Sequence, residues 1–375
     1  MEEPKRRLDT FLAGNVVESI QKEHGPNILA RADNHKHQRS YRILTGIFPI
    51  DYALGGGIPV GKTTIIYGHK STGKSVICLR ALSGAQRTCT LCYTEQKIDL
   101  KTGEVVPCAC GKFREHLCAY IDVEGSWDTD WVQLCGVRTD DVLLSRPEYA
   151  EQALDIIEAL LRSNELDLII VDSLAFLTPA KEIEEGVGKA LQAEQARTFG
   201  RAIRKFGSAL NYVENHTERR PTLLFTNQIR MKTGVIFGSP ETVSGGLAPG
   251  FSSSAEIRTA GGKYVLDETT QRPVHVDLDF RVEKNKTSVA KLEGSWRLCL
   301  ADTELKKKGD TYDEPAMLDW GIKIGLVEQE ANKKGWSCLG EKYKTKTLFV
   351  ERLIRDMVFR QTYCQTLLQI LTAAG

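Results

Sequence analysis

The sequence predicts an α/β fold built on a mostly parallel sheet that helices cover on both faces. Three apolar runs, "HLCAYIDVEGSW", "LDLIIVDSLAFL" and "PTLLFTNQIRMK", are nearly continuous, and stretches of helical periodicity separate them. Continuous apolar strands are typical of parallel sheets whose two faces are both buried. Each run stops at polar residues, and open sheets of this class bind ligands beyond the carboxyl ends of their strands. The sequence therefore predicts the fold class and also the edge of the sheet where a functional site should lie.

One of the covering helices is predicted for the segment Lys189–His216. Its apolar residues recur at alternating spacings of three and four, namely Ala196, Phe199, Ile203, Phe206, Leu210 and Val213. This is the period of an amphipathic helix whose apolar face packs on a sheet, and we assign it no chemistry.

Composition and charge restrict the class of protein. The 375 residues are enough for roughly two domains, and 41% hydrophobic and 26% charged residues are ordinary for a soluble globular protein. With a net charge of +1, any nucleic-acid site must come from a local basic patch. We expect neither a membrane span nor a signal peptide, because no apolar run is long enough and the segment "MEEPKRRLDT" is charged. The expected location is cytoplasmic, where ten cysteines are better tested as metal ligands than as disulfides.

The stretch "GGIPVGKTTIIYGHKSTGKS" contains the phosphate-loop pattern G-x-x-x-x-G-K-[ST] twice, at Gly56–Thr63 and at Gly68–Ser75. A working loop follows a buried strand and opens a helix whose positive end faces the phosphates. The β-branched run "TTIIY" after the first match predicts a strand, whereas "SVICLRALSGAQ" after the second places Val76, Leu79 and Leu82 on one helical face. The second match is therefore the predicted nucleotide-binding loop, and the first is a turn rich in glycine and proline. The predicted loop comprises Gly68, His69, Lys70, Ser71, Thr72, Gly73, Lys74, Ser75 and Val76.

Polar residues at the ends of the three predicted strands suit phosphoryl transfer to water. Lys74 should reach the β- and γ-phosphates, and Ser75 should help to hold Mg²⁺. Asp172 is the expected acidic group of the Mg²⁺ shell, Glu124 is a candidate to orient or activate the attacking water, and Gln228 could sense the γ-phosphate. The alternative is that strand ends carry such residues simply to meet solvent. Three polar ends beside a phosphate loop favour the functional interpretation.

The chain resembles RecA-type homologous recombinases from about Val17 to about Asp356. The resemblance is carried by "GIPVGKTTIIYGHKSTGKS", "IDVEGSWD", "IIVDSLAFLTPAKEIE", "NQIRMKTGVIFGSPETVSGG", "EKNKTSV" and "KKGWSCLGEKY". The fourth of these is the most specific and resembles the second DNA-binding loop of the family. The resemblance implies a RecA-like P-loop ATPase core, ATP and Mg²⁺ as cofactors, and catalytic roles for Lys74, Glu124 and Gln228.

The resemblance also implies that ATP lies between the subunits of a helical filament. Lys284 and Lys286 of "EKNK" match the lysines that reach the ATP of the neighbouring subunit. Asp128 falls at the adenine-contacting position, and Trp131 stands where the family usually has tyrosine, a change that should still allow stacking on the base. On this basis hydrolysis would be coupled to filament assembly.

Two loops are implied to bind DNA, the first from about Glu182 to Lys189 and the second from about Ile229 to Gly246. Arg230 and Lys232 are suited to bind phosphate, and Phe237 corresponds to a group that lies against bases. The complete set of implied DNA-binding residues is Glu182, Gly186, Gly188, Arg230, Met231, Lys232, Phe237, Gly238, Thr242, Gly245 and Gly246.

The resemblance divides the chain into three parts. Residues 1–40, which include "VVESIQKEHGPNILAR", correspond to a helix and strand that dock on the adjacent subunit, with Ile28 and Leu29 as packing residues. Residues 41–304 correspond to the ATPase core. Residues 305–375 correspond to a small C-terminal α+β domain, in which "KKGWSCLGEKYKTKTL" provides a basic surface for duplex DNA.

Residues 88–116 form an insertion relative to the family and predict a zinc-ribbon-like hairpin. Cys89-x-x-Cys92 and Cys108-x-Cys110 predict two turns that flank a hairpin with "KTGE" at its tip. Paired thiolates on two turns suit a closed, tetrahedral structural Zn²⁺ site. His116 or Cys118 could replace a ligand of the tighter second pair, although Cys118 fits better in the following core strand. The alternative without metal is four solvent-exposed thiols on a loop.

The expected function is that of an ATP-dependent recombinase that polymerises on single-stranded DNA and pairs it with a homologous duplex in DNA recombination and repair. Repressor or mediator proteins are further candidate partners. Two alternatives remain open. A ring-shaped RecA-like motor such as a helicase is disfavoured by the second DNA loop and the N-terminal docking segment. A non-catalytic DNA-binding mediator is disfavoured by the intact Lys74, Glu124 and Gln228.

Overall fold

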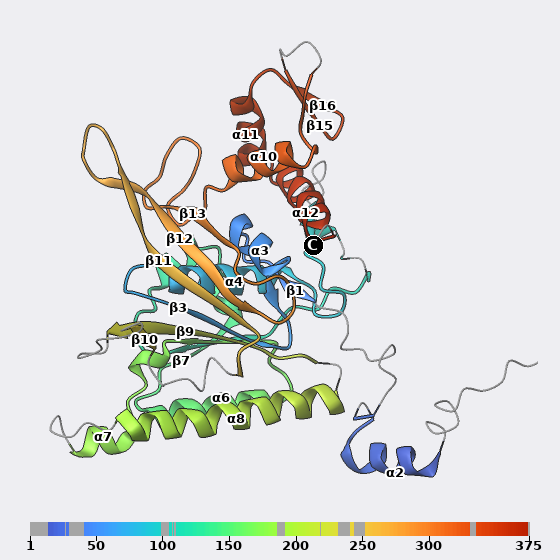
Figure 1. The fold of residues 1–375 in the computed structure, drawn as a ribbon, viewed down its shortest axis with the longest axis vertical. Coiled ribbons are helices and arrows are strands. Elements are labelled where there is room, and N and C mark those ends of the chain that lie inside the picture. Colours follow the sequence, from blue (N-terminus) through green and yellow to red (C-terminus); the bar gives the residue numbers. More distant parts are fainter. Residues whose placement is uncertain are drawn as a thin grey trace, which may run out of the picture.

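A single mixed sheet forms the centre of the molecule (Figure 1). The computed structural model describes residues 14–26, 28–29, 41–98, 105–106, 108, 110–185, 192–217, 219–231, 241–243, 252–330 and 335–373. Within these residues the sheet has nine strands in the order β13-β12-β11-β3-β9-β8-β6-β7, with β10 paired to β9.

Six neighbouring strands of this sheet run parallel. They are β11 (Ala255–Leu266), β3 (Thr63–Gly68), β9 (Thr222–Met231), β8 (Leu168–Asp172), β6 (Cys118–Asp122) and β7 (Val142–Ser145). The antiparallel additions are β12 (Pro273–Asn285), β13 (Glu293–Cys299) and β10 (Glu241–Val243). The predicted mostly parallel sheet is confirmed, and the three apolar runs of the sequence are β6, β8 and β9.

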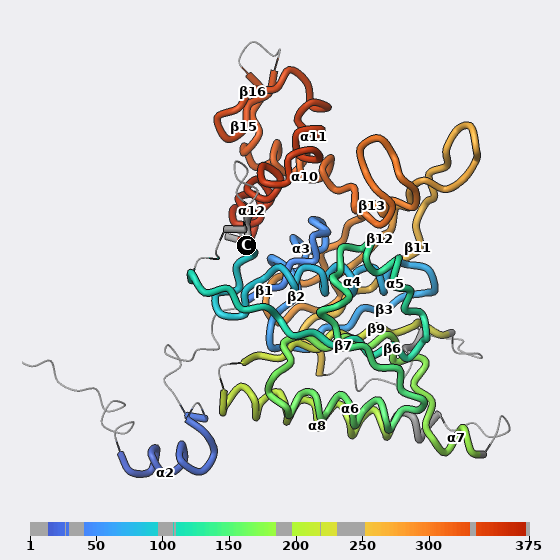
Figure 2. Tube along the Cα trace, turned by 180° about the vertical axis from the view of Figure 1, so that it is seen from behind, coloured from blue at the N-terminus to red at the C-terminus, as the bar shows by residue number. Residues whose placement is uncertain are grey.

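Helices cover both faces of the sheet, as Figure 1 and Figure 2 show from opposite sides. One face packs against α3 (Phe48–Leu54), α4 (Lys74–Arg87) and α5 (Thr129–Leu134), and the other against α6 (Ala150–Arg162) and α8 (Gln192–His216). Successive strand residues point to opposite faces, so Ile170 lies in the first core and Ile169 in the second. Because both faces are buried, the strands read as continuous apolar runs.

The predicted packing face of α8 is confirmed. Phe199, Ile203, Phe206 and Val213 are all buried, and Leu210 packs against the same core.

The two phosphate-loop matches fold as predicted from their flanks. After the first match the chain enters β3, and the match itself contains the two-residue strand β2 (Ile58–Pro59), which pairs with β1 (Arg42–Ile43). Gly56 and Gly57 have φ values of +109° and +119°, and a Cβ at Gly57 would lie 2.4 Å from the Ile43 carbonyl oxygen. The first match is therefore a glycine-dependent turn. Only the second match connects a strand, β3, to a helix, α4.

The N-terminal segment agrees with the prediction only in its helix. Residues Asn15–His24 form α2, but Ile28 and Leu29 lie in a bend and not in a strand, and they are 37% and 38% exposed. A docking strand would pair with the adjacent subunit, so this part of the prediction stays a prediction. The rest of the predicted docking segment lies outside the described residues.

Short elements complete the core. The insertion contains β4 (Lys97–Ile98) paired with β5 (Val105–Val106), while the predicted "KTGE" tip lies outside the described residues. Between β6 and α8 come η2 (Thr139–Asp141), η3 (Leu174–Phe176) and α7 (Ala180–Glu185).

The C-terminal part surrounds a third hydrophobic core, which also contains Phe48 of α3. This part of the chain contains α10 (Glu314–Lys323), β14 (Glu328–Gln329), β15 (Trp336–Cys338), β16 (Glu341–Tyr343), α11 (Lys346–Arg355) and α12 (Met357–Ala373). Met317, Phe349 and Tyr363 are fully buried there, and the Tyr363 hydroxyl donates to the Met317 carbonyl oxygen at 3.0 Å. This mixture of helices and short strands agrees with the predicted α+β class. Among the described helices of the whole chain, none combines the length and apolarity needed to cross a bilayer.

Candidate functional site

The loop between β3 and α4 requires its glycines. A Cβ on Gly68 would lie 2.3 Å from the Thr259 Oγ1 and 2.4 Å from its carbonyl oxygen, which is closer than atoms can pack. Gly73 precedes α4 with φ +82°, and a Cβ there would lie 2.7 Å from Leu278 Cδ1. The Thr72 hydroxyl closes the loop by donating to the His69 carbonyl oxygen at 2.9 Å. These constraints hold the chain in a tight turn that aims the amino end of α4 at the loop, as phosphate binding requires.

Lys74 lies inside this turn. Its Nζ donates to the His69 carbonyl oxygen at 2.5 Å, and the residue is only 8% exposed. Burial lowers the pKa of Lys74, while the nearby Asp172 and Glu124 carboxylates raise it. An ammonium group held inside the loop at the amino end of α4 favours an anion there.

The predicted site residues converge at the carboxyl edge of the sheet. Gly68, where β3 ends, pairs with Gln228 of β9, and Asp172, where β8 ends, pairs with Asp122 of β6. Because β3, β9, β8 and β6 are consecutive in the sheet, the phosphate loop lies beside these three strand ends. The sequence pattern alone predicted this convergence, and the roles of the individual residues stay predictions.

Asp172 is held by two hydroxyl groups that sequence reasoning missed. The carboxylate is 1% exposed, with Tyr120 donating to Oδ2 at 2.7 Å and Thr226 donating to Oδ1 at 2.5 Å. Each carboxylate oxygen has a further lone pair, so the group keeps the capacity to bind Mg²⁺ directly or through water. No local motif marks Tyr120 or Thr226, because only the order of strands places them on either side of Asp172.

Glu124 sits on a turn that Asp122 organises. The Asp122 carboxylate accepts from the Ser126 and Trp127 amides at 2.9 and 3.1 Å, and the Glu124 amide donates to the Asp172 carbonyl oxygen at 3.1 Å. Partial burial raises the pKa of Glu124, as does the Asp172 carboxylate, whereas Lys74 and Lys70 lower it. A raised pKa suits a group that accepts a proton from water. The signal for Asp122 was present in the sequence as an aspartate opening a turn.

The predicted adenine contacts lie together at the start of α5. Asp128 is its N-cap and accepts from the Trp131 amide at 2.8 Å. The Lys308 ammonium lies 5.8 Å from the centre of the Trp131 ring, within reach of a cation–π contact. Lys308 was not predicted, and no motif singles it out.

Lys284 and Lys286 are not brought to the phosphate loop. Lys284 of β12 pairs with Glu256 of β11, its Nζ is 3.6 Å from the Glu256 Oε1, and Glu256 pairs with Ile65 near the start of β3. Gly68 follows three residues later, which corresponds to about 10 Å of strand. The two lysines therefore lie towards the opposite edge of the sheet from the phosphate loop of their own chain.

The described ends of the predicted DNA loops lie at the same edge as the nucleotide site and belong to strands and a helix. Arg230 and Met231 belong to β9, and Thr242 belongs to β10. The two strands pair antiparallel with Thr242 opposite Arg230, so both ends of the predicted second loop are strands. Glu182 lies in α7 and not in a loop. The exposed Arg230 donates to the Ala175 carbonyl oxygen at 3.1 Å, and this bond joins β9 to η3, which precedes α7 in the chain. The predicted residues that lie outside the described part are Gly186, Gly188, Lys232, Phe237, Gly238, Gly245 and Gly246.

The four predicted metal ligands come together. The thiol sulfurs of Cys89, Cys92, Cys108 and Cys110 all lie within 4.8 Å of one another, with Cys89–Cys110 at 3.8 Å and Cys108–Cys110 at 3.2 Å. A tetrahedral zinc with Zn–S bonds of about 2.3 Å places its sulfurs about 3.8 Å apart. The cluster therefore fits a metal of this size and geometry. The alternative of four exposed thiols is wrong, because Cys89 and Cys108 are buried.

His116 and Cys118, the alternative ligands, are engaged elsewhere. The His116 Nδ1 is 2.8 Å from the Thr88 carbonyl oxygen, and Cys118 is a fully buried residue of β6. The prediction that Cys118 belongs to the core strand is confirmed.

Comparison with known proteins identifies relatives along most of the chain. The family model described as RecA N-terminal domain matches residues 12–104 and 104–298, and the break between these matches falls inside the cysteine-rich insertion. The protein called Protein RecA from Desulfotalea psychrophila is 35% identical over 323 residues, covering 85% of this chain and 81% of the relative. Those from Pseudomonas putida and Cutibacterium acnes are 34% and 37% identical, and cover 88% and 84% of this chain and 80% of each relative.

Proposed function

The chain belongs to the RecA family of recombinases, which act by DNA strand exchange in recombination and repair, and we propose that it couples DNA-dependent ATP hydrolysis to this exchange. The observation that carries the proposal is the edge of the sheet where Lys74, Asp172 and Gln228 meet beside the DNA-loop segments. ATP hydrolysis at this edge would change how well ordered the DNA-binding segments are.

Each residue of the edge has a task in phosphoryl transfer. Lys74 neutralises the β- and γ-phosphates, and Glu124, on its turn held by Asp122, orients the attacking water. The Ser75 hydroxyl and the Asp172 carboxylate are hard oxygen donors of the kind that Mg²⁺ prefers. When bound, Mg²⁺ would neutralise charge on the phosphate oxygens. The Gln228 amide, in the strand that continues towards the second DNA loop, reports the presence of the γ-phosphate.

The arrangement also supports a filament with ATP between subunits. Lys284 and Lys286 lie away from the phosphate loop of their own chain, which supports a role at the ATP of the neighbouring chain. The exposed Val16, Ile28 and Leu29 are apolar residues suited to docking on that neighbour. We propose residues 1–40 as the docking segment, 41–304 as the ATPase core and 305–375 as the C-terminal domain. Electron microscopy on single-stranded DNA separates this filament from a closed ring.

Turnover of ATP with and without single-stranded DNA tests the function. We expect DNA to stimulate hydrolysis, and Lys74→Ala to lower the stimulated rate by about 100-fold or more, because the developing phosphate charge loses its main cation. Lys62→Ala is the matched control, since it removes the lysine of the first match and should keep activity.

Two results would contradict the proposal. Turnover that ignores DNA would show that the DNA-binding segments are misassigned, and would favour a motor or mediator. Loss of activity in Lys62→Ala with retention in Lys74→Ala would show that the nucleotide binds at the first match.

We further propose that the four-cysteine cluster holds a structural Zn²⁺. Four thiolates leave no open position for a substrate, and zinc prefers such soft ligands. Metal analysis of the purified protein should find zinc equimolar with the chain, and Cys92→Ser should lower its retention. Cys364→Ser, which changes a cysteine outside the cluster, should keep the metal. Equal zinc content in both variants would contradict the assignment.

A further inference from the structure

We propose that the metal site fastens the C-terminal helix α12 to the end of the phosphate-loop helix α4. This inference rests on the proposed Zn²⁺ site and assigns the insertion a task inside its own chain. The contacts that carry it involve Arg87, Glu95, Gln96 and Gln361, which we call the α4–α12 bridge.

The metal site begins where α4 ends. Arg87 is the last residue of α4, and the first ligand, Cys89, comes two residues later. The chain then turns back on itself, because the Cys89 amide donates to the Thr94 carbonyl oxygen at 3.0 Å and the Gln96 amide donates to the Arg87 carbonyl oxygen at 2.8 Å. The turn that carries Cys89 and Cys92 therefore sets the position of Glu95 and Gln96 against the end of α4.

Gln361 of α12 binds these two residues. Its Nε2 donates to the Glu95 Oε2 at 3.2 Å and to the Gln96 carbonyl oxygen at 3.3 Å. The other carboxylate oxygen of Glu95 is 3.8 Å from the Arg87 Nε, and the Glu95 side chain is only 14% exposed. One carboxylate thus touches the last residue of the phosphate-loop helix and a residue of α12.

Beside the bridge the insertion and α12 are not closely packed. A crevice of 620 Å³ separates them and is lined by Tyr93, Thr94 and Cys108 from the insertion and by Gln365 and Leu368 from α12. Among the described residues, the hydrogen bonds of Gln361 therefore contribute to the attachment of α12 to the insertion.

We expect the insertion to depend on the metal for its geometry. In its described residues the hairpin pairs two residues of β4 with two of β5, and a two-stranded hairpin is marginal in water. In a module of this size the free energy of metal binding is folding free energy. Loss of the metal should therefore loosen the turn that carries Glu95 and Gln96 and weaken the bridge.

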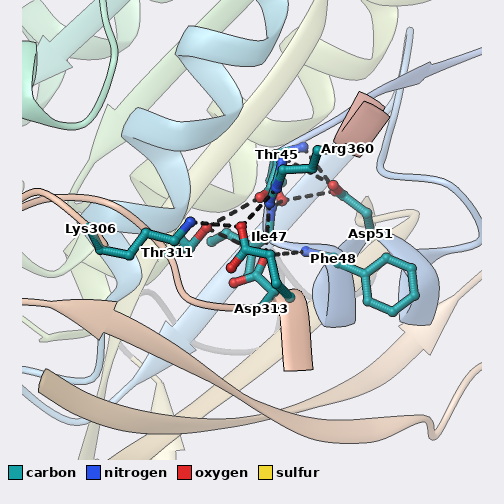
Figure 3. Close-up of polar contacts among 10 residues, drawn as sticks. Thr45, Ile47, Phe48, Asp51, Lys306, Thr311, Asp313 and Arg360 are labelled. Carbon is teal, nitrogen blue, oxygen red and sulfur yellow. Dashed lines mark hydrogen bonds and ion pairs between the residues drawn. The ribbon is translucent and has the colours of Figure 1, made fainter. Parts of the chain in front are cut away.

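A second anchor keeps α12 in place when the bridge is lost. Figure 3 shows Arg360, the residue before Gln361, beside Asp313 in a buried polar cluster of Thr45, Asp51 and Lys306. The Arg360 Nε also lies 2.9 Å from the Glu314 Oε1. This cluster does not involve the cysteines, so metal removal should loosen α12 without unfolding it.

Hydrogen exchange of the full chain, measured with and without a zinc chelator, tests the inference. We expect chelation to accelerate exchange of the α12 amides about fivefold, as the loss of one hydrogen-bonded anchor implies. Gln361→Ala should show the same acceleration while retaining its zinc, which separates the bridge from the metal. Gln369→Ala, which removes the same amide from an exposed position of α12, is the matched control and should behave as the wild type.

The outcomes distinguish the inference from its premise. If chelation removes zinc and α12 exchange is unchanged, the bridge is refuted and the zinc site stands. If Gln361→Ala leaves α12 exchange unchanged, Gln361 is not the connection and the inference is refuted. If the purified wild type contains no zinc, the premise and the inference both fall.

Discussion

Replacing Arg360 by alanine should destabilise the C-terminal part of the chain by about 3 kcal/mol. The guanidinium lies 2.9 Å from the Glu314 Oε1 and 3.7 Å from the Asp313 Oδ2, and these two carboxyl groups belong to residues that are 0% and 2% exposed (Figure 3). Removing one partner of a buried ion pair costs about 3–5 kcal/mol, because a charge is left without compensation. We expect a cost at the lower end of this range, because Lys306 stays 2.7 Å from the Glu314 Oε1 and still compensates part of its charge.

The destabilisation should depend on pH. Burial alone would raise the pKa of Glu314, but Arg360 and Lys306 together hold it below its ordinary value. A lowered pKa contributes stability above the unfolded value of about 4.3, and this stability is lost as pH falls through the folded value. The part of the difference between wild type and Arg360→Ala that comes from Glu314 should therefore be full at neutral pH and should shrink below about pH 4.3.

Urea unfolding followed by tryptophan fluorescence at several pH values measures both effects. Arg162→Ala is the control, because Arg162 forms an exposed pair with Glu158 at 3.0 Å and its loss should cost no more than about 1 kcal/mol. A cost for Arg360→Ala that equals the control, or that does not change with pH, would refute the reasoning that this buried cluster joins the C-terminal part to the core.

Two further predictions concern the nucleotide site. Gly73→Ala would place a Cβ 2.7 Å from Leu278 Cδ1 on a residue with a left-handed φ of +82°. ATP affinity, measured by calorimetry, should therefore fall about tenfold, while thermal melting shows that the protein is folded. Wild-type affinity would show that the loop does not need this glycine. Tyr120→Phe removes the donor 2.7 Å from Asp172 Oδ2, so ATP hydrolysis should need about tenfold more Mg²⁺. Tyr212→Phe changes an exposed tyrosine and should not alter the Mg²⁺ requirement. If wild type, Tyr120→Phe and Tyr212→Phe all need the same Mg²⁺ concentration, Tyr120 is not part of the Mg²⁺ site.

Features that depend on neighbouring residues could be predicted from the sequence. The choice between the two phosphate-loop matches depended on the segment directly after each match, a β-branched run in one case and a helical face in the other. The structure agrees because backbone preference acts over a few residues. Buried parallel strands were visible as continuous apolar runs, because both of their faces are covered. The spacing of Cys89, Cys92, Cys108 and Cys110 predicted a cluster, since two turns on one hairpin must meet.

Other features depend on which segments become neighbours in space. Tyr120 and Thr226 reach Asp172 from β6 and β9, and nothing in their surroundings along the chain marks them. The docking strand predicted for residues 1–40 stays a prediction, because a strand that docks on a neighbouring chain needs that chain to pair with. Gln361 reaches Glu95 across 266 residues of chain. A periodic pattern shows which face of an element is buried, but the partner on that face is selected by packing of the whole chain.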